Sequence, residues 1–162
     1  MEKKYRKIGL FLLSGLFSAI VALPLHAQTA DKLEALLGKQ ALSWQEAAAF
    51  ILEASDLGVF NESGAAFKYA SEQNWLPKNA ASADTASLNG IALLLMRSFN
   101  LKGGIFYSIA KSPHHAYREL CYKGIIRGDT DPDMPVSGRE LLLISGRILS
   151  IKENEAGQGV KK

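Results

Sequence analysis

The side chains that could do chemistry gather in one acidic loop, where oxygen ligands recur at the spacing of an EF-hand calcium loop. The matching residues are Asp129, Asp131, Asp133, Val136, Ser137 and Glu140. Met134 replaces the glycine of the sharp sixth-position turn, and two prolines stiffen the loop. The same oxygens also fit a turn capped by Asp side chains, with Ser137 and Glu140 as a helix capping box. We expect the capped turn and no metal site, with calcium as the alternative.

The other reactive side chains form no catalytic constellation. His114 and His115 are adjacent in an expected first helical turn and point apart, whereas a metal pair or catalytic base on a helix would use a spacing of four. Cys121 shares an apolar stripe with Tyr117 and Leu120, which indicates an inert buried thiol. The sequence has no Gly-rich phosphate loop, no Ser-His-Asp order and no Cys cluster. We therefore expect a protein that is not an enzyme and needs no cofactor.

The elements that must position these side chains follow an export signal. Basic residues within 3–7 precede an apolar stretch over 8–23, and a small residue stands at Ala27, where signal peptidase reads the chain. The apolar stretch is shorter than the about 20 residues of a membrane span. We expect residues 1–27 to be a cleaved signal peptide. The mature protein, from Gln28, should then reside in the periplasm or cell envelope without stable membrane insertion.

Removal of that signal leaves an electrically neutral protein. The segment holds four of the chain's 19 Lys and Arg residues and one of its 16 Asp and Glu residues, so 15 of each remain. The net charge of +3 thus belongs to the signal, and the mature chain offers no electrostatic reason to bind nucleic acid. About 135 residues suffice for one domain with a core. The single Cys121 cannot form an internal disulfide, so packing must supply the stability.

Helical spacing dominates the mature chain, and the alternation typical of strands is absent. A pattern of helix, loop and helix over residues 61–100 returns at 111–150 with a constant offset of fifty positions. Ala66 returns as Ala116, and Arg97 returns as Arg147. These features predict an all-α fold with two full helix-loop-helix repeats. Apolar periodicity ends near Lys152, so we expect a disordered tail over 152–162.

A third copy is partial. The second helix of each full repeat begins with an apolar residue and a serine, and Leu42-Ser43-Trp44-Gln45-Glu46 has the same start. Residues 42–60 therefore match a second helix, and a short helix over 31–37 would stand in for the first. Units of this size bury little alone and stack on their neighbours. We expect one compact bundle of three related units, with pseudo-threefold symmetry, over residues 28–151.

An apolar linker joins the two full repeats. It consists of Lys102-Gly103-Gly104 followed by Ile105-Phe106-Tyr107. Apolar linkers either pack into the core or meet a partner. We expect this one to pack.

The last repeat resembles the S-layer homology domain family. Residues 116–129 match its first helix and Gly-Ile-Ile-x-Gly turn, and Val136-Ser137-Gly138-Arg139-Glu140 occupies the place of its Ile-Thr-Arg-Ala-Glu signature. The resemblance covers about residues 42–150. It implies a three-repeat helical bundle that anchors exported proteins to cell-wall polymers through grooves lined by the signature residues. The binding residues that it implies here are Ser43, Trp44, Glu46, Ser137, Arg139 and Glu140.

The chain departs from that signature at the arginine expected to grip an anionic wall sugar, because a guanidinium fork suits carboxylates. Trp44, Leu88 and Gly138 stand at this position, and Gly90 replaces the signature glutamate in the middle copy. The resemblance implies a non-catalytic envelope module that associates with peptidoglycan or another cell-wall glycan. The missing arginines favour the alternative, a periplasmic protein–protein adaptor that keeps the fold and recruits another envelope protein.

Overall fold

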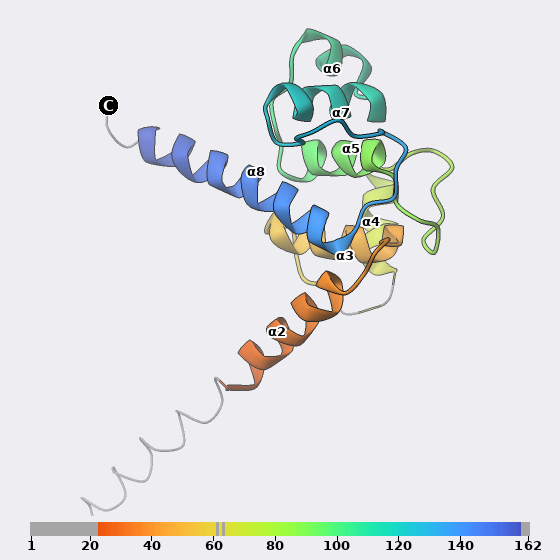
Figure 1. Ribbon diagram of the computed structural model, residues 1–162, viewed down its shortest axis with the longest axis vertical. Coiled ribbons are helices and arrows are strands. Elements are labelled where there is room, and N and C mark those ends of the chain that lie inside the picture. The colour runs from red at the N-terminus through yellow and green to blue at the C-terminus, as the bar shows by residue number, and fades with distance from the viewer. Residues whose placement is uncertain (1–22, 61, 63, 160–162) are drawn as a thin grey trace, which may run out of the picture. The chain divides into compact units, whose positions relative to one another are not determined.

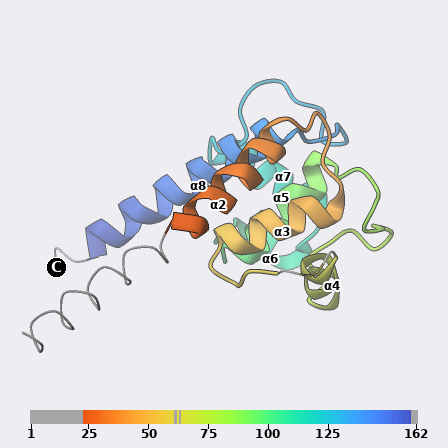
Figure 2. The ribbon, with the colours of Figure 1, turned by 90° about the horizontal axis from the view of Figure 1, so that it is seen from below.

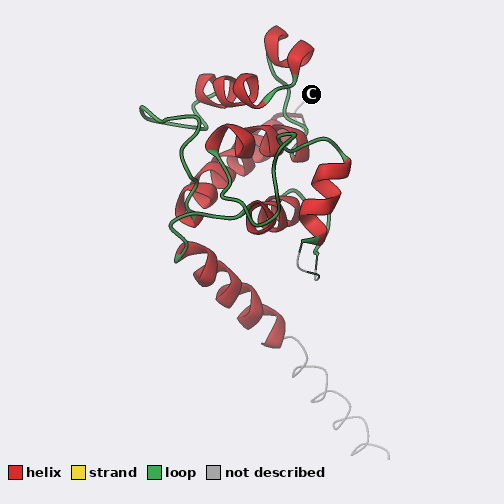
Figure 3. Cartoon of the chain, turned by 90° about the vertical axis from the view of Figure 1, so that its right-hand side faces the viewer, coloured by secondary structure: helices red, strands yellow, loops and turns green. Residues whose placement is uncertain are grey.

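The computed structural model of the chain describes residues 23–60, 62 and 64–159 (Figure 1). Within these residues the structure consists of seven helices and two isolated bridges without a strand, which confirms the all-α prediction for this part (Figure 3). Residues 1–22 of the expected signal peptide and 160–162 of the expected tail lie outside the described residues. None of the described helices combines the length and hydropathy that a membrane crossing requires.

The chain divides into two compact units, residues 1–38 and 39–162. The first contains α2 (Leu23–Leu37), which begins eight residues before the helix expected over 31–37. Pro24 suits the first turn of a helix, because an N–H group has no intrahelical partner there. Gly38 ends the unit, and its N–H donates to the Glu34 carbonyl over 3.1 Å. The expected cleavage point after Ala27 therefore falls within a helix of the uncleaved chain.

The second unit packs around α5. Its helices are α3 (Trp44–Ala54), α4 (Ala65–Glu72), α5 (Leu88–Ser98), α6 (Ile105–Ala110), α7 (Pro113–Tyr122) and α8 (Gly138–Gly159). Most residues of α5 are buried. This helix contacts α7 and α3; α3 also contacts α4 and α8, and α6 contacts α7 (Figure 1 and Figure 2). The helices α4, α5 and α7 lie within the residue ranges where helix, loop and helix are expected, and α8 begins within the second range and extends beyond it.

The segments that start α3, α5 and α8 bond to one another in a closed ring, which we call the backbone ring. The Leu42 N–H donates to the Val136 carbonyl over 2.9 Å, the Ala86 N–H to the Leu42 carbonyl over 2.8 Å, and the Val136 N–H to the Ala86 carbonyl over 3.2 Å. All three residues are fully buried. Each buried N–H and carbonyl thus finds a partner without water, which is the condition for burying backbone.

Two residues further along each segment, a second set of backbone hydrogen bonds joins the same three segments. The N–H groups of Trp44, Leu88 and Gly138 donate to the carbonyls of Asp84, Met134 and Lys39, respectively, over 3.0 Å in each case. Each helix start is therefore held by the loop that precedes another helix start. This arrangement fixes the directions in which α3, α5 and α8 leave the junction.

The Trp44 side chain packs against α5 at Gly90. Its side chain is buried, with 4% of its surface exposed, and it lies over Gly90. A Cβ atom at Gly90 would overlap the Trp44 ring and would also lie 2.9 Å from Cγ of Pro77. The close approach of the indole therefore requires glycine at this position. A single packing contact thus accounts for both Trp44 and Gly90, two positions at which the sequence differs from the S-layer homology signature.

The tail differs from its prediction. Helix α8 continues through 152–159, where the sequence predicts disorder. Lys, Glu and Ala in this segment are good helix formers. Its first turn is also attached to the core, because Nζ of Lys152 donates to the Phe99 carbonyl over 3.3 Å and lies 5.6 Å from the centre of the Phe99 ring. The side chains of residues 153–157 are exposed, so the sequence has no apolar periodicity there from which the helix could be predicted.

Two glycine substitutions, one at the Trp44 contact and one at an exposed helical site, should change the free energy of unfolding in opposite directions. Gly90→Ala should lower the free energy of unfolding by about 1–3 kcal/mol, because the new methyl group overpacks the core. Gly146→Ala, at an exposed helical site where an added Cβ atom would meet nothing within 4 Å beyond its own helix backbone and chain neighbours, should raise it by about 0.5–1 kcal/mol through helix propensity. Urea denaturation of both variants measures the two changes. Equal stability of the two variants would contradict the packing described here.

Candidate functional site

The helix start of α3 uses its polar groups within the fold. The Ser43 N–H and Oγ both donate to Oε2 of Glu46, over 2.9 and 2.8 Å, and Nζ of Lys39 lies 3.0 Å from Oε1. The hydrogen bond from the Ser43 N–H lowers the pKa of Glu46 against the opposing effect of its burial, and Lys39 acts in the same direction. Both carboxylate oxygens of Glu46 thus have a partner in the fold. The side chain of Trp44, one of the binding residues that the resemblance implies, is buried in the core.

The start of α8 is only half capped. The Glu140 N–H donates to Oγ of Ser137 over 3.2 Å, but the Glu140 carboxylate makes no hydrogen bond or ion pair with the residues that the structure describes. Burial raises the pKa of this carboxyl group. Arg139 is exposed. Lys39 connects the two sets of expected binding residues, since its carbonyl accepts from Gly138 and its ammonium pairs with Glu46.

The acidic loop is organised by its own hydrogen bonds. Oδ1 of Asp131 accepts from the Asp133 N–H over 2.9 Å, as expected for a turn capped by Asp. Oδ1 of Asp133 accepts from the Asn89 side-chain amide over 2.7 Å, which ties the loop to α5. Within residues 23–60, 62 and 64–159, no three His, Cys, Asp or Glu side chains gather as a metal site would require. These two bonds occupy Asp131 and Asp133, two of the six residues that suggested the calcium alternative.

The histidines and the cysteine are placed by α7. Ser112 caps this helix, with Pro113 in its first turn, and Oγ of Ser112 accepts from the His115 N–H over 3.4 Å. Oγ of Ser112 also lies 2.7 Å from Nδ1 of His115. Cys121 is half-buried rather than fully buried as expected. It lies outside both pockets described below.

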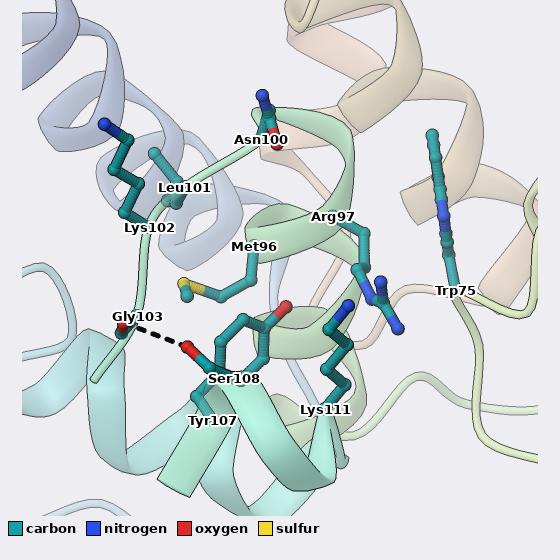
Figure 4. Close-up of a pocket in the computed structure, with 10 residues that line it drawn as sticks. All are labelled: Trp75, Met96, Arg97, Asn100, Leu101, Lys102, Gly103, Tyr107, Ser108 and Lys111. Carbon is teal, nitrogen blue, oxygen red and sulfur yellow. Dashed lines mark hydrogen bonds between the residues drawn. The ribbon is translucent and has the colours of Figure 1, made fainter. Parts of the chain in front are cut away.

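A pocket of about 650 Å³ lies at the opposite end of α5 from the backbone ring (Figure 4). We call it the basic pocket. Its lining residues are Trp75, Met96, Arg97, Asn100, Leu101, Lys102, Gly103, Tyr107, Ser108 and Lys111. Three of these side chains are cationic and none is acidic. Positive charge is thus concentrated at this pocket.

Arg97 is the most unusual residue of this pocket. Its Nε atom is buried and has no hydrogen-bond partner among the described residues. Its counterpart in the last repeat, Arg147, donates from Nη1 to the Ile125 carbonyl over 2.7 Å. Arg97 as a whole is half-buried and lines the pocket, so its guanidinium group offers charge-assisted donors to an oxyanion there.

Tyr107 stands beside Arg97. Its side chain is 6% exposed, and burial raises the pKa of its hydroxyl group while the charge of Arg97 acts in the opposite direction. Figure 4 shows the Tyr107 hydroxyl directed toward Arg97 and Lys111, with the Trp75 ring on the far wall. Gly103 permits this placement, because a Cβ atom there would lie 2.9 Å from Cβ of Tyr107. The expectation that the apolar linker packs holds for Tyr107 alone, because Ile105 and Phe106 are exposed.

Sequence reasoning did not identify the basic pocket as a site. The sequence contains the linker Lys102-Gly103-Gly104 and an arginine that recurs after fifty positions. Neither feature indicates which of the two arginines hydrogen-bonds to a backbone carbonyl. No protein-family model, curated protein or solved structure matches this chain. The arrangement at Arg97 is therefore judged on its own chemistry, as a cationic, aromatic-walled cleft able to hold an anionic group.

The two glutamates predict opposite pH responses of stability. The lowered pKa of Glu46 means that its ionised form stabilises the fold at neutral pH, and that this contribution is lost as the pH falls through the lowered pKa. The raised pKa of Glu140 means that its contribution is present in acid and is lost as the pH rises through the raised pKa.

Glu46→Gln should therefore lower the free energy of unfolding at pH 7 by about 0.5–1 kcal/mol, and the deficit should vanish as the pH falls from neutral through the lowered pKa. Glu140→Gln should leave that free energy unchanged or raise it at pH 7. Urea denaturation of both variants and the parent protein across this pH range measures the difference. Parallel pH profiles for the two variants would show that the two carboxyl groups do not differ as described.

Proposed function

We propose that the protein is a non-catalytic module of the cell envelope that binds an anionic wall glycan, and that the basic pocket holds the glycan. The observation that carries this proposal is Arg97, a half-buried cation that lines the pocket beside Tyr107 and whose Nε has no hydrogen-bond partner among the described residues. Arg97 replaces in function the signature arginines that the helix starts lack. Peptidoglycan and its attached polymers supply carboxylates of the kind that a guanidinium fork binds.

The walls of the basic pocket suit a sugar. Trp75 presents an aromatic surface, and rings of this kind pack against apolar sugar faces while polar groups bind the hydroxyl groups. Lys111 adds a second cation beside Arg97, and the Tyr107 hydroxyl adds a neutral donor. A carboxylated sugar stacked near Trp75 would thus meet Arg97 and Lys111 with its acid group.

The proposed fold and address are consistent with this function. The backbone ring joins Leu42, Ala86 and Val136, which hold the same place in the three proposed copies, and this supports a pseudo-threefold bundle like that of S-layer homology domains. We also propose that residues 1–27 direct export and are then removed, so that the module works in the periplasm or cell envelope. Wall polymers are found in that compartment.

One observation favours the adaptor as a second candidate function. The side chains of Ile105, Phe106 and Ile109 on α6 are 76%, 78% and 81% exposed. The linker therefore packs only through Tyr107 and leaves three large apolar groups in solvent. Apolar groups clustered in this way mark contact sites for other proteins.

Sedimentation with purified sacculi tests the proposed function and separates the two candidates. Arg97→Gln and Lys111→Gln should each weaken binding about tenfold, because each removes a charge-assisted contact. Lys68→Gln removes an exposed cation outside the basic pocket and should bind as the parent does. The variant Ile105→Ser with Phe106→Ser and Ile109→Ser should also bind normally.

Two outcomes decide against wall binding at this pocket. Parent protein that stays in the supernatant would remove the proposal. A second outcome would favour the adaptor function over wall binding. In that outcome sacculi bind neither the parent protein nor the triple serine variant, and only the parent protein crosslinks to envelope proteins.

A further inference from the structure

A second pocket lies on the other side of the segment 100–102 from the basic pocket. Its volume is about 270 Å³, and we call it the second pocket. Its lining residues are Phe99, Asn100, Leu101, Lys102, Lys123, Ile125, Ile148, Ile151, Lys152 and Glu155. Asn100, Leu101 and Lys102 line both pockets. The two pockets are therefore neighbours that share one wall.

The shared wall is a fixed part of the fold. Asn100 adopts a left-handed backbone conformation at φ +50°, and its N–H donates to the Arg97 carbonyl over 3.2 Å. The Leu101 N–H donates to the Met96 carbonyl over 2.9 Å. Lys102 extends away from Arg97 in Figure 4, although it borders both pockets. These bonds fix the backbone of residues 100–102, which we call the ridge and which carries the cation Lys102.

Positive charge continues across this ridge. The two pockets together present Arg97, Lys111, Lys102, Lys123 and Lys152, whereas Glu155 is the only acidic residue that lines either pocket in the described chain. Lys152 is held at the Phe99 carbonyl, and Nζ of Lys123 lies 3.4 Å from Oε1 of Glu119. The same glutamate accepts from the Gly104 N–H through Oε2 over 2.9 Å. The cations of the second pocket thus have fixed positions near the linker.

We infer that the ligand is a linear anionic polysaccharide that crosses the ridge at 100–102 and occupies both pockets. This inference rests on the proposed function and specifies its ligand class. A small ligand in the basic pocket would leave Lys152, which makes no ion pair among the described residues, without an anionic partner. Lys123 already pairs with Glu119 and adds only its residual positive field, whereas a chain with repeated carboxylates meets cations on both sides of Lys102. Linking two weak sites in this way raises affinity through the effective concentration of the second group.

Chain length is the variable that tests the inference. Galacturonic-acid oligomers of two and about twelve sugars serve as probes, and calorimetry on the full chain measures their affinities. The longer oligomer should bind at least about tenfold more tightly than the shorter one, because it reaches the second pocket. Neutral dextran should not bind. An oligothymidylate of matched charge should bind more weakly than the long galacturonate.

Two substitutions locate the effect. Lys152→Gln should weaken binding of the long oligomer about threefold to tenfold and leave the short one unchanged, and Lys152→Arg should restore the parent affinity. Arg97→Gln should weaken binding of both oligomers. Thermal melting of each variant verifies that it is folded.

The outcomes separate the two proposals. Equal affinity for both lengths, or equal loss for both with Lys152→Gln, would overturn the spanning ligand while leaving the basic pocket as the site. Binding of neither oligomer in an Arg97-dependent manner would overturn the proposed function itself. Tighter binding of the oligothymidylate would overturn the polysaccharide as the ligand class.

Discussion

The second unit depends on the backbone ring, in which Leu42, Ala86 and Val136 each donate to one neighbour and accept from the other. All three residues are fully buried, and a buried backbone group left without a partner costs about 1–3 kcal/mol. Any change in the direction of one segment would therefore leave groups of the other two without partners. This constraint determines where α3, α5 and α8 begin, and it places the far end of α5, with Arg97 and Asn100, where the linker passes.

The same constraint explains why the polar groups and the indole at the start of α3 are engaged within the fold. Trp44 and Gly90 form one tight contact beside the ring, so the ring of Trp44 and the missing glutamate of the middle copy are parts of a single packing solution. Glu46 is held by Ser43 and Lys39. At the other end of α5, by contrast, the guanidinium of Arg97 has a buried nitrogen without a partner. Trp44 and Glu46 at the ring end of α5 are thus engaged in contacts within the fold, whereas Arg97 at the other end keeps a nitrogen without a partner among the described residues.

The spacing of residues was enough to predict helices where α4, α5, α7 and α8 lie, because apolar periodicity and caps such as Ser112-Pro113 are local properties. The basic pocket was not predictable in this way. Arg97 and Arg147 have the same place in the repeat pattern, and only three-dimensional packing decides that Arg147 reaches the Ile125 carbonyl while Arg97 faces Tyr107. The helical continuation of α8 was also missed, because Lys152 is attached to Phe99 by one polar contact that leaves no periodic signal.

The central claim is that an anionic glycan binds at Arg97 and not at the helix starts. Nuclear magnetic resonance of the ¹⁵N-labelled protein tests it most directly, by following the side-chain Nε–H signal of Arg97 and the backbone amides of Ser43 and Gly138 during titration with galacturonate oligomers. The account predicts that the Arg97 signal shifts and becomes protected from exchange while the two amides stay in place. Shifts at Ser43 and Gly138 with an unchanged Arg97 signal would contradict it.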